Sequence, residues 1–123
     1  MIRVAINGFG RIGRSFTRAI QHHPEIELVA INDLADTKTL AHLLKYDSVH
    51  RAFNGLVEHS EKDMTINGKK VVVSAEREPR KLPWAELSID VVVECTGLFL
   101  TRALAQEHLE AGAKKVILSA PAK

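Results

Sequence analysis

A glycine string at residues 8–13 (GFGRIG) constrains the fold of this chain more than any other feature of the sequence. The residues before it, 2–7, are rich in β-branched side chains, which is typical of a strand. Beyond it, apolar residues recur at helical spacing over 11–22, and Pro24 then stops the pattern. A second apolar run at 27–32 follows. This order predicts a βαβ unit in a parallel sheet that is covered on both faces.

The rest of the chain alternates in a similar way. The Asn-Gly pair at 67–68 suits a two-residue hairpin turn. Further expected elements are a helix over 37–45, a hairpin over 64–73, a helical turn over 82–87, a strand over 91–94, a helix over 101–111 and a strand over 116–118. We therefore predict an α/β fold of the Rossmann type, a doubly wound and mostly parallel sheet with an antiparallel hairpin excursion.

The predicted sheet is incomplete, because a full fold of this type has about six parallel strands in two halves. We expect residues 1–123 to form one domain of a longer protein.

The glycine string has the context that a dinucleotide site requires. Gly8 permits the tight turn, Gly10 lets the backbone approach a pyrophosphate, and Gly13 allows the helix to pack on the strand. The start of the helix, near Arg11 and Ile12, offers unpaired N–H groups to phosphate. The sequence therefore predicts a pyrophosphate site at this turn.

Asp33 lies 20 residues after Gly13, at the end of the second strand. This spacing fits a carboxylate that binds the adenosine ribose hydroxyls and repels a 2′-phosphate. Leu34 and Ala35 bring no compensating cation, so NAD is favoured over NADP. The alternative is a glycine turn in a nucleotide-free α/β protein, with Asp33 as a solvated residue at a strand end.

Four predicted strands end in small or polar residues, at Asn7-Gly8, Asn32-Asp33, Thr96-Gly97 and Ser119-Ala120. Ligands of open α/β sheets bind outside the carboxyl ends of the strands, so these residues are candidates for cofactor contact. The alternative is that they merely begin loops.

The cysteine, the histidines and the tryptophan are interpreted as structural residues. Cys95 follows an apolar strand without a supporting histidine, which favours a packed thiol over a nucleophile. The six histidines lack metal-ligand spacing, so no metal site is expected; His42 and His108 are interpreted as surface or hydrogen-bonded residues. Trp84 is expected to anchor packing.

Composition argues against several classes of protein. The net charge is +2 and the basic residues are scattered, so no nucleic-acid partner is expected. No apolar run is long enough to span a membrane, and the chain start lacks a secretion-signal pattern. A single cysteine cannot form an internal disulfide, so a cytoplasmic location is expected.

Several long motifs resemble the phosphorylating glyceraldehyde-3-phosphate dehydrogenase family. They are residues 4–14, 30–34, 45–50, 94–97 and 111–123, which together extend along essentially the whole chain. The sequence departs from the family pattern at 51–53, where Arg-Ala-Phe stands in place of Gly-Arg-Phe, and this puts the shape of that loop in doubt.

The resemblance implies specific roles in binding NAD. It assigns Arg11 and Ile12 to the pyrophosphate, Asp33 to the adenosine ribose and Arg77 to the adenine side. It also places Thr96, Gly97 and Phe99 along the cofactor, and Ser119 and Ala120 near the nicotinamide end.

The resemblance further implies the chemistry of the parent enzyme, a homotetramer of glycolysis. In the family a thiolate attacks glyceraldehyde 3-phosphate, hydride passes to NAD, and inorganic phosphate releases the acyl group. The family's nucleophilic cysteine and its partner histidine lie downstream of Lys123, so this chain is expected to be inactive by itself. Two alternatives stay open: an erythrose-4-phosphate dehydrogenase, and a nucleotide-binding module without catalysis.

Overall fold

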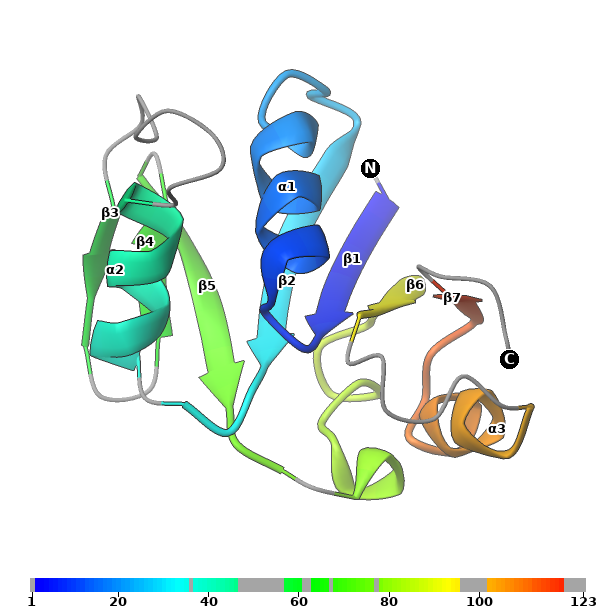
Figure 1. Cartoon of the computed structure of the whole chain (residues 1–123). Helices are drawn as coiled ribbons and strands as arrows, with labels where there is room; N and C mark the ends of the chain where they lie inside the picture. Colours follow the sequence, from blue (N-terminus) through cyan, green and yellow to red (C-terminus); the bar gives the residue numbers. More distant parts are fainter. Residues whose placement is uncertain are drawn as a thin grey trace.

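In the computed structural model of the chain, the described residues are 2–35, 37–46, 57–60, 63–66, 68–76, 78–95 and 102–118. Figure 1 shows the arrangement of the helices and strands. The strands are β1 (Ile2–Asn7), β2 (Ile26–Asn32), β3 (Val57–His59), β4 (Asp63–Ile66), β5 (Lys69–Ser74), β6 (Val91–Glu94) and β7 (Lys115–Leu118). The helices are α1 (Arg11–Ile20), α2 (Thr37–Tyr46) and α3 (Arg102–Glu110), with a short 3₁₀ turn, η1 (Pro79–Lys81).

The described strands form a seven-stranded sheet in the order β3-β4-β5-β2-β1-β6-β7. The neighbours from β5 to β7 are parallel, whereas β4 runs antiparallel to both β3 and β5. When the parallel strands are numbered by their order along the chain, they lie across the sheet in the order third, second, first, fourth, fifth, which is the Rossmann order. The predicted fold class and the antiparallel hairpin are confirmed, and Gly68 in the hairpin turn has a φ of +82°.

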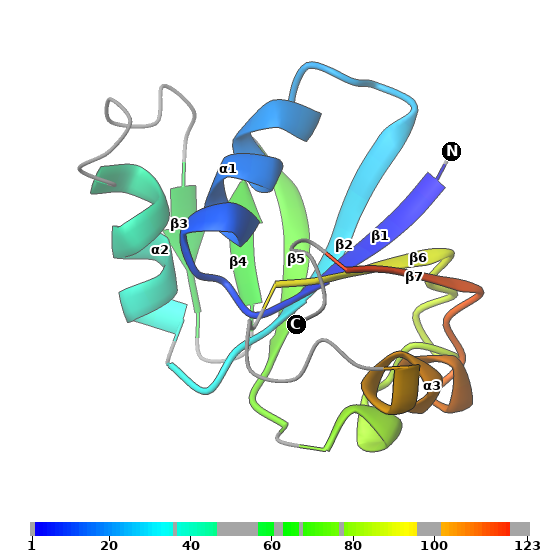
Figure 2. The same ribbon diagram turned by 45° about the vertical axis from the view of Figure 1, so that its right-hand side comes forward.

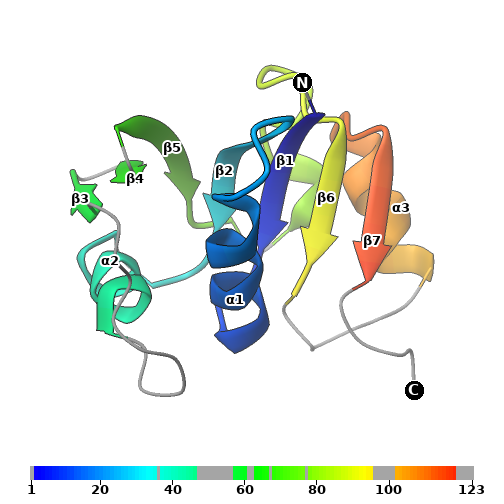
Figure 3. The same ribbon diagram turned by 90° about the horizontal axis from the view of Figure 1, so that it is seen from above.

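Helices cover both faces of the sheet, as the near-continuously apolar strands predict. Figure 3 shows α1 and α2 on one face and α3 on the other, and Figure 2 shows η1 beside α3. Each face has its own buried cluster. The α1/α2 face includes Ile6, Phe9, Leu28, Ile31, Leu40, Leu44 and Met64, and the α3 face includes Ala5, Val29, Ala30, Leu82, Trp84, Ile89 and Val92.

An irregularity between β1 and β2 alters the alternation of side chains along β2. Val4 pairs with Leu28 but Ala5 pairs with Ala30, so Val29 is an extra residue on β2. Such a bulge places two successive residues on one face. Val29 and Ala30 accordingly both belong to the cluster on the α3 face.

The remaining predictions differ from the structure mainly at element ends. The predicted turn over 82–87 is a single helical turn, in which the Leu87 N–H donates to the Pro83 carbonyl at 3.1 Å. Trp84, which lies in this turn, is fully buried, as expected for a packing anchor. Strand β3 was not predicted, because three residues are too few to establish a period. No helix in the described ranges is long and apolar enough to cross a membrane.

Hydrogen bonds of Asp90 hold the start of β6 between its two neighbouring strands, β1 and β7. Its N–H donates to the Arg3 carbonyl at 2.8 Å, its carboxylate Oδ2 accepts from the Arg3 N–H at 2.9 Å, and its carbonyl accepts from the Lys115 N–H at 2.9 Å. The Lys114 Nζ lies 3.2 Å from Asp90 Oδ1. The hydrogen bond from the Arg3 backbone, with help from Lys114, lowers the pKa of Asp90 below its usual value.

This lowered pKa predicts how stability depends on pH. The ionised Asp90 stabilises the folded chain fully above the ordinary aspartate pKa of about 3.9, and the contribution is lost as the pH falls through the lower pKa of the folded state. Asp90→Asn should therefore have a lower melting temperature than the unaltered chain at pH 7. The difference should shrink steadily in thermal melts below about pH 4. A difference that stays constant down to acid pH would show that the carboxylate charge is irrelevant.

Candidate functional site

The glycine string connects the end of β1 to the start of α1. Gly8 has a φ of +92°, a value that favours glycine, and its N–H donates to the Asn32 carbonyl of β2 at 2.8 Å. On the other side of β1, the Cys95 N–H donates to the Asn7 carbonyl at 2.7 Å. Strand β1 lies where the strand order reverses, and open α/β sheets bind ligands at the carboxyl ends of the strands around this point.

Gly13 permits the close approach of α1 to this turn. A Cβ atom at Gly13 would lie 2.6 Å from the Gly8 carbonyl oxygen and 3.2 Å from Cγ2 of Ile6. Gly10 differs, because a Cβ atom there would meet no heavy atom within 4 Å. Gly10 therefore borders open space, whereas Gly13 is in close contact with the turn.

The N-terminus of α1 is left open. Its N-cap residue, Gly10, makes no side-chain cap, and the Arg14 N–H donates to the Gly10 carbonyl at 2.9 Å as the first helical bond. The amides of residues 11–13 thus have no acceptor within the helix. The first turn contains no acidic residue, and the Arg14 guanidinium lies against the Phe9 carbonyl at 3.0 Å. An unfilled row of N–H groups beside glycine fits the negative charge of a pyrophosphate.

Asp33 lies directly against the glycine string. Its carboxylate Oδ2 accepts from the Phe9 N–H at 2.8 Å, and Oδ1 accepts from the Ala35 N–H at 3.0 Å. A carboxylate has about four acceptor positions, so two remain for a diol such as ribose. Leu34 follows with 59% of its surface exposed.

The structure brings Asp33, the glycine string and the start of α1 together, with Ile12 half exposed. The other predicted site residues lie outside the described residues: Arg77, Thr96, Gly97, Phe99, Ser119 and Ala120. The side chain of Arg11 is likewise not described, although its backbone begins α1. Cys95 is half-buried and packs against the cluster on the α1/α2 face, as expected for a packed thiol.

The sequence pattern did not predict that the polar residues at the strand ends are buried. Asn7, Asn32 and Glu94 end β1, β2 and β6, and each has 5% or less of its surface exposed. His108 of α3 is fully buried and hydrogen-bonded to Glu94. The feature of the sequence that could have indicated these residues is the polar residue that ends each otherwise apolar strand.

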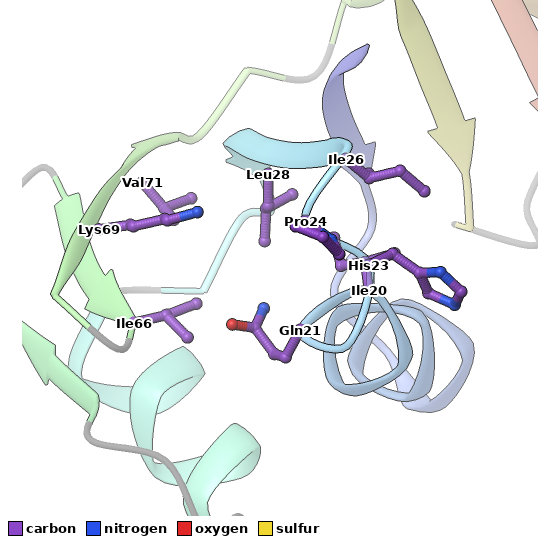
Figure 4. A pocket seen from close by; sticks show the side chains of 9 residues that line it. All are labelled: Ile20, Gln21, His23, Pro24, Ile26, Leu28, Ile66, Lys69 and Val71. Carbon is purple, nitrogen blue, oxygen red and sulfur yellow. The ribbon is translucent and has the colours of Figure 1, made fainter. Parts of the chain in front are cut away.

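A small hollow lies away from this site, between the carboxyl end of α1 and the β4–β5 hairpin (Figure 4). Its volume of about 50 Å³ suits water molecules and is far too small for a dinucleotide. It is lined by Ile20, Gln21, His23, Pro24, Ile26, Leu28, Ile66, Lys69 and Val71. Within the described part of the chain, no cluster of three or more His, Cys, Asp or Glu residues could hold a metal ion.

Comparison with known proteins identifies the domain. Residues 2–102 match the family described as "Glyceraldehyde 3-phosphate dehydrogenase, NAD binding domain". The chain belongs to this family. NAD is therefore the cofactor of the domain, in agreement with the open helix start and with Asp33.

The chain is similar to several longer proteins named glyceraldehyde-3-phosphate dehydrogenase. The chain is 61% identical to the protein of Thermotoga maritima, over 100% of this chain and 38% of that protein. It is 57% identical to the protein of Geobacillus stearothermophilus, over 99% of this chain and 36% of that protein. The Bacillus subtilis protein, "Glyceraldehyde-3-phosphate dehydrogenase 1", is 55% identical over 98% of this chain and 36% of that protein. The chain thus spans little more than a third of these relatives.

The two glycines Gly10 and Gly13 allow binding to be separated from folding. Gly13→Ala should lower the free energy of unfolding by about 1–3 kcal/mol, because the new methyl group collides with the Gly8 carbonyl. Gly10→Ala should change it by less than about 0.5 kcal/mol, since its φ of −78° is ordinary and the space is free. Gly10→Ala should nevertheless weaken NAD binding about tenfold by blocking the approach of the pyrophosphate.

Denaturant unfolding and calorimetric titration with NAD measure the two quantities. Unimpaired NAD binding by Gly10→Ala would contradict the proposed position of the pyrophosphate.

Proposed function

We propose that residues 1–123 form the cofactor domain of a glycolytic glyceraldehyde-3-phosphate dehydrogenase, an oxidoreductase that reduces NAD. The observation that supports this most is the open start of α1 with the Asp33 carboxylate bound to the Phe9 N–H beside it. This arrangement offers donors to a diphosphate and acceptors to a ribose within one turn of chain.

Each part of the described site has a defined task in this proposal. The amides of Arg11 and Ile12 bind the pyrophosphate, and Gly10 keeps the approach free of a side chain. Asp33 accepts hydrogen bonds from the adenosine ribose, and its charge repels the 2′-phosphate of NADP. Bound NAD supplies the hydride acceptor, while the chain's own residues bind and orient it.

The remaining residues of the proposed site rest on the family resemblance. Arg77 is assigned to the adenine side, and Thr96, Gly97 and Phe99 line the cofactor. Ser119 and Ala120 border the nicotinamide end. In the sequence each of them follows the end of β5, β6 or β7, and the carboxyl ends of these parallel strands meet at one edge of the sheet, which supports a shared ligand.

The activity of the whole protein is proposed from its relatives. The full-length enzyme oxidises and phosphorylates glyceraldehyde 3-phosphate with inorganic phosphate, in the cytoplasm and as a homotetramer. Its nucleophilic cysteine and partner histidine belong to a catalytic domain outside residues 1–123. The erythrose-4-phosphate alternative is not favoured, because the similar proteins carry the glyceraldehyde name. This chain alone then acts only as a nucleotide-binding module.

The role of Asp33 predicts cofactor preference. The unaltered chain should bind NAD more tightly than NADP, and Asp33→Asn should reduce this preference about tenfold, the size of a charged hydrogen bond. Glu27→Gln, which removes the same charge near the opposite end of β2, is the matched control and should leave the preference unchanged. Titration calorimetry with both cofactors measures the ratio. Equal affinity of the unaltered chain for NAD and NADP would contradict the role of Asp33.

The absence of the family's nucleophile from residues 1–123 predicts no turnover. The chain should form no NADH from glyceraldehyde 3-phosphate and phosphate, because its single cysteine, Cys95, is packed against the core. Absorbance of NADH at saturating NAD measures this, with Cys95→Ser as the control for adventitious thiol chemistry. Appreciable turnover by the unaltered chain that disappears in Cys95→Ser would make Cys95 a nucleophile and overturn this assignment.

A further inference from the structure

A continuous chain of buried hydrogen bonds runs beneath the carboxyl ends of the central strands. We name it the polar relay. It starts in the turn before β6, passes through α3, and crosses β6, β1 and β2 to the segment after β5. Its members are Trp84, His108, Glu94, Asn7, Asn32 and the backbone of Glu76.

The first half of the polar relay centres on Glu94. The Trp84 indole Nε1 donates to His108 Nδ1 at 3.0 Å, and His108 Nε2 lies 2.6 Å from Glu94 Oε2. The Asn7 side-chain Nδ2 donates to the same oxygen at 2.7 Å. Trp84, His108 and Glu94 are completely buried, so these bonds are shielded from water.

The second half connects Asn7 to Asn32. The Asn32 Nδ2 donates to Asn7 Oδ1 at 2.7 Å and to the Glu76 carbonyl at 2.9 Å. The Asn32 Oδ1 accepts from the Glu76 N–H at 2.9 Å. The backbone of Glu76 thus fixes which way the Asn32 amide faces, and Asn32 in turn fixes Asn7.

The indole at the other end fixes the protons. An indole N–H can only donate, so His108 Nδ1 must be an acceptor without a proton. The imidazole then carries its proton on Nε2 and donates to Glu94. Glu94 Oε2 therefore accepts from both His108 and Asn7 and carries no proton. Donation from the two anchored ends therefore converges on Glu94 Oε2.

Members of the polar relay immediately precede residues of the proposed NAD site. Asn7 precedes Gly8, Asn32 precedes Asp33, and Glu76 precedes Arg77. Glu94 stands two residues before Thr96. The relay thus joins, by side-chain bonds, chain segments that contact different parts of the dinucleotide in the proposed function.

A buried carboxyl group contributes little to the stability of a core. Burying a carboxyl group carries a desolvation cost, and apolar side chains of similar volume often stabilise as well or better. A hydrogen-bonded network instead fixes relative positions, because each bond requires a particular geometry. Glu94 and His108 are therefore better suited to setting the positions of strand ends than to adding stability.

We propose that Glu94 and His108 are positioning residues for NAD, which hold the ends of β1, β2 and β6 in the arrangement that the cofactor requires. This inference rests on the proposed function for its ligand. His108 acts through Glu94 and Asn7 on Gly8, and through Asn32 on Asp33. Neither His108 nor Glu94 is assigned a contact with the cofactor.

Substitutions at position 108 separate positioning from stability. His108→Leu removes both hydrogen bonds, whereas His108→Gln can donate to Glu94 and accept from Trp84 with the same polarity. Ile89→Ala is the control, because Ile89 is buried beside Trp84 in the same apolar cluster but outside the polar relay. Thermal melts of all three variants establish the loss of stability for each.

Calorimetric titration with NAD gives the decisive readout. His108→Leu should raise the dissociation constant about tenfold, His108→Gln should restore it to within about threefold, and Ile89→Ala should leave it within about twofold. If His108→Leu does not fold, Glu94→Gln carries the same test, with an expected rise of about threefold because charge-assisted bonds are the stronger ones. Equal dissociation constants for the relay variants and Ile89→Ala would overturn the inference.

Two further measurements separate this inference from the proposed function. Long-range ¹H–¹⁵N spectra of the unaltered chain at pH 7 should show a proton on His108 Nε2 and none on Nδ1, and the opposite result would overturn the proton assignment. NAD binding that is weakened by Gly10→Ala but not by the relay variants would leave the proposed function intact and refute the positioning role. No NAD binding by the unaltered chain would refute both.

Discussion

The contact between α1 and the end of β1 is the constraint on which the rest of the structure depends. A Cβ atom at Gly13 would sit 2.6 Å from the Gly8 carbonyl, so only glycine lets the helix begin so close to the strand. This contact sets the first amides of α1 over the carboxyl edge of the sheet, next to Asp33. It also orients α1 so that its apolar side packs with Ile6, Leu28 and Ile31. One steric requirement thus serves the core and the cofactor site together.

Buried polar side chains, which lie beneath that contact, also organise the carboxyl edge of the sheet. Strands that are apolar along most of their length end in Asn7, Asn32 and Glu94, all buried. Buried polar groups must find partners, and here they find one another across three strands. At this edge, a layer of hydrogen-bonded side chains therefore lies between the apolar core and solvent. An edge built this way can hold loops in defined positions without side chains that project into the ligand space.

This construction explains how a common fold supports a specific ligand. A Rossmann sheet provides a crevice at its switch point, but a crevice alone does not select NAD. In the proposed function, selection comes from the open helix start, from the free space at Gly10, and from the Asp33 carboxylate as the acceptor for a ribose. Membership in the NAD-binding domain family agrees with each of these features.

The sequence by itself determined the elements and the site motif, because periodicity, glycine spacing and a turn-forming Asn-Gly pair are local signals. It correctly indicated β1, α1, the hairpin and the position of Asp33, and it missed β3, whose three residues carry no period. Only the tertiary structure decided the bulge at Val29, which depends on how β1 and β2 pair. Likewise, His108 looked like any helical histidine until the fold brought it to Glu94 and Trp84, 14 and 24 residues away. Burial and proton position arise from contacts between distant segments, and no local pattern encodes them.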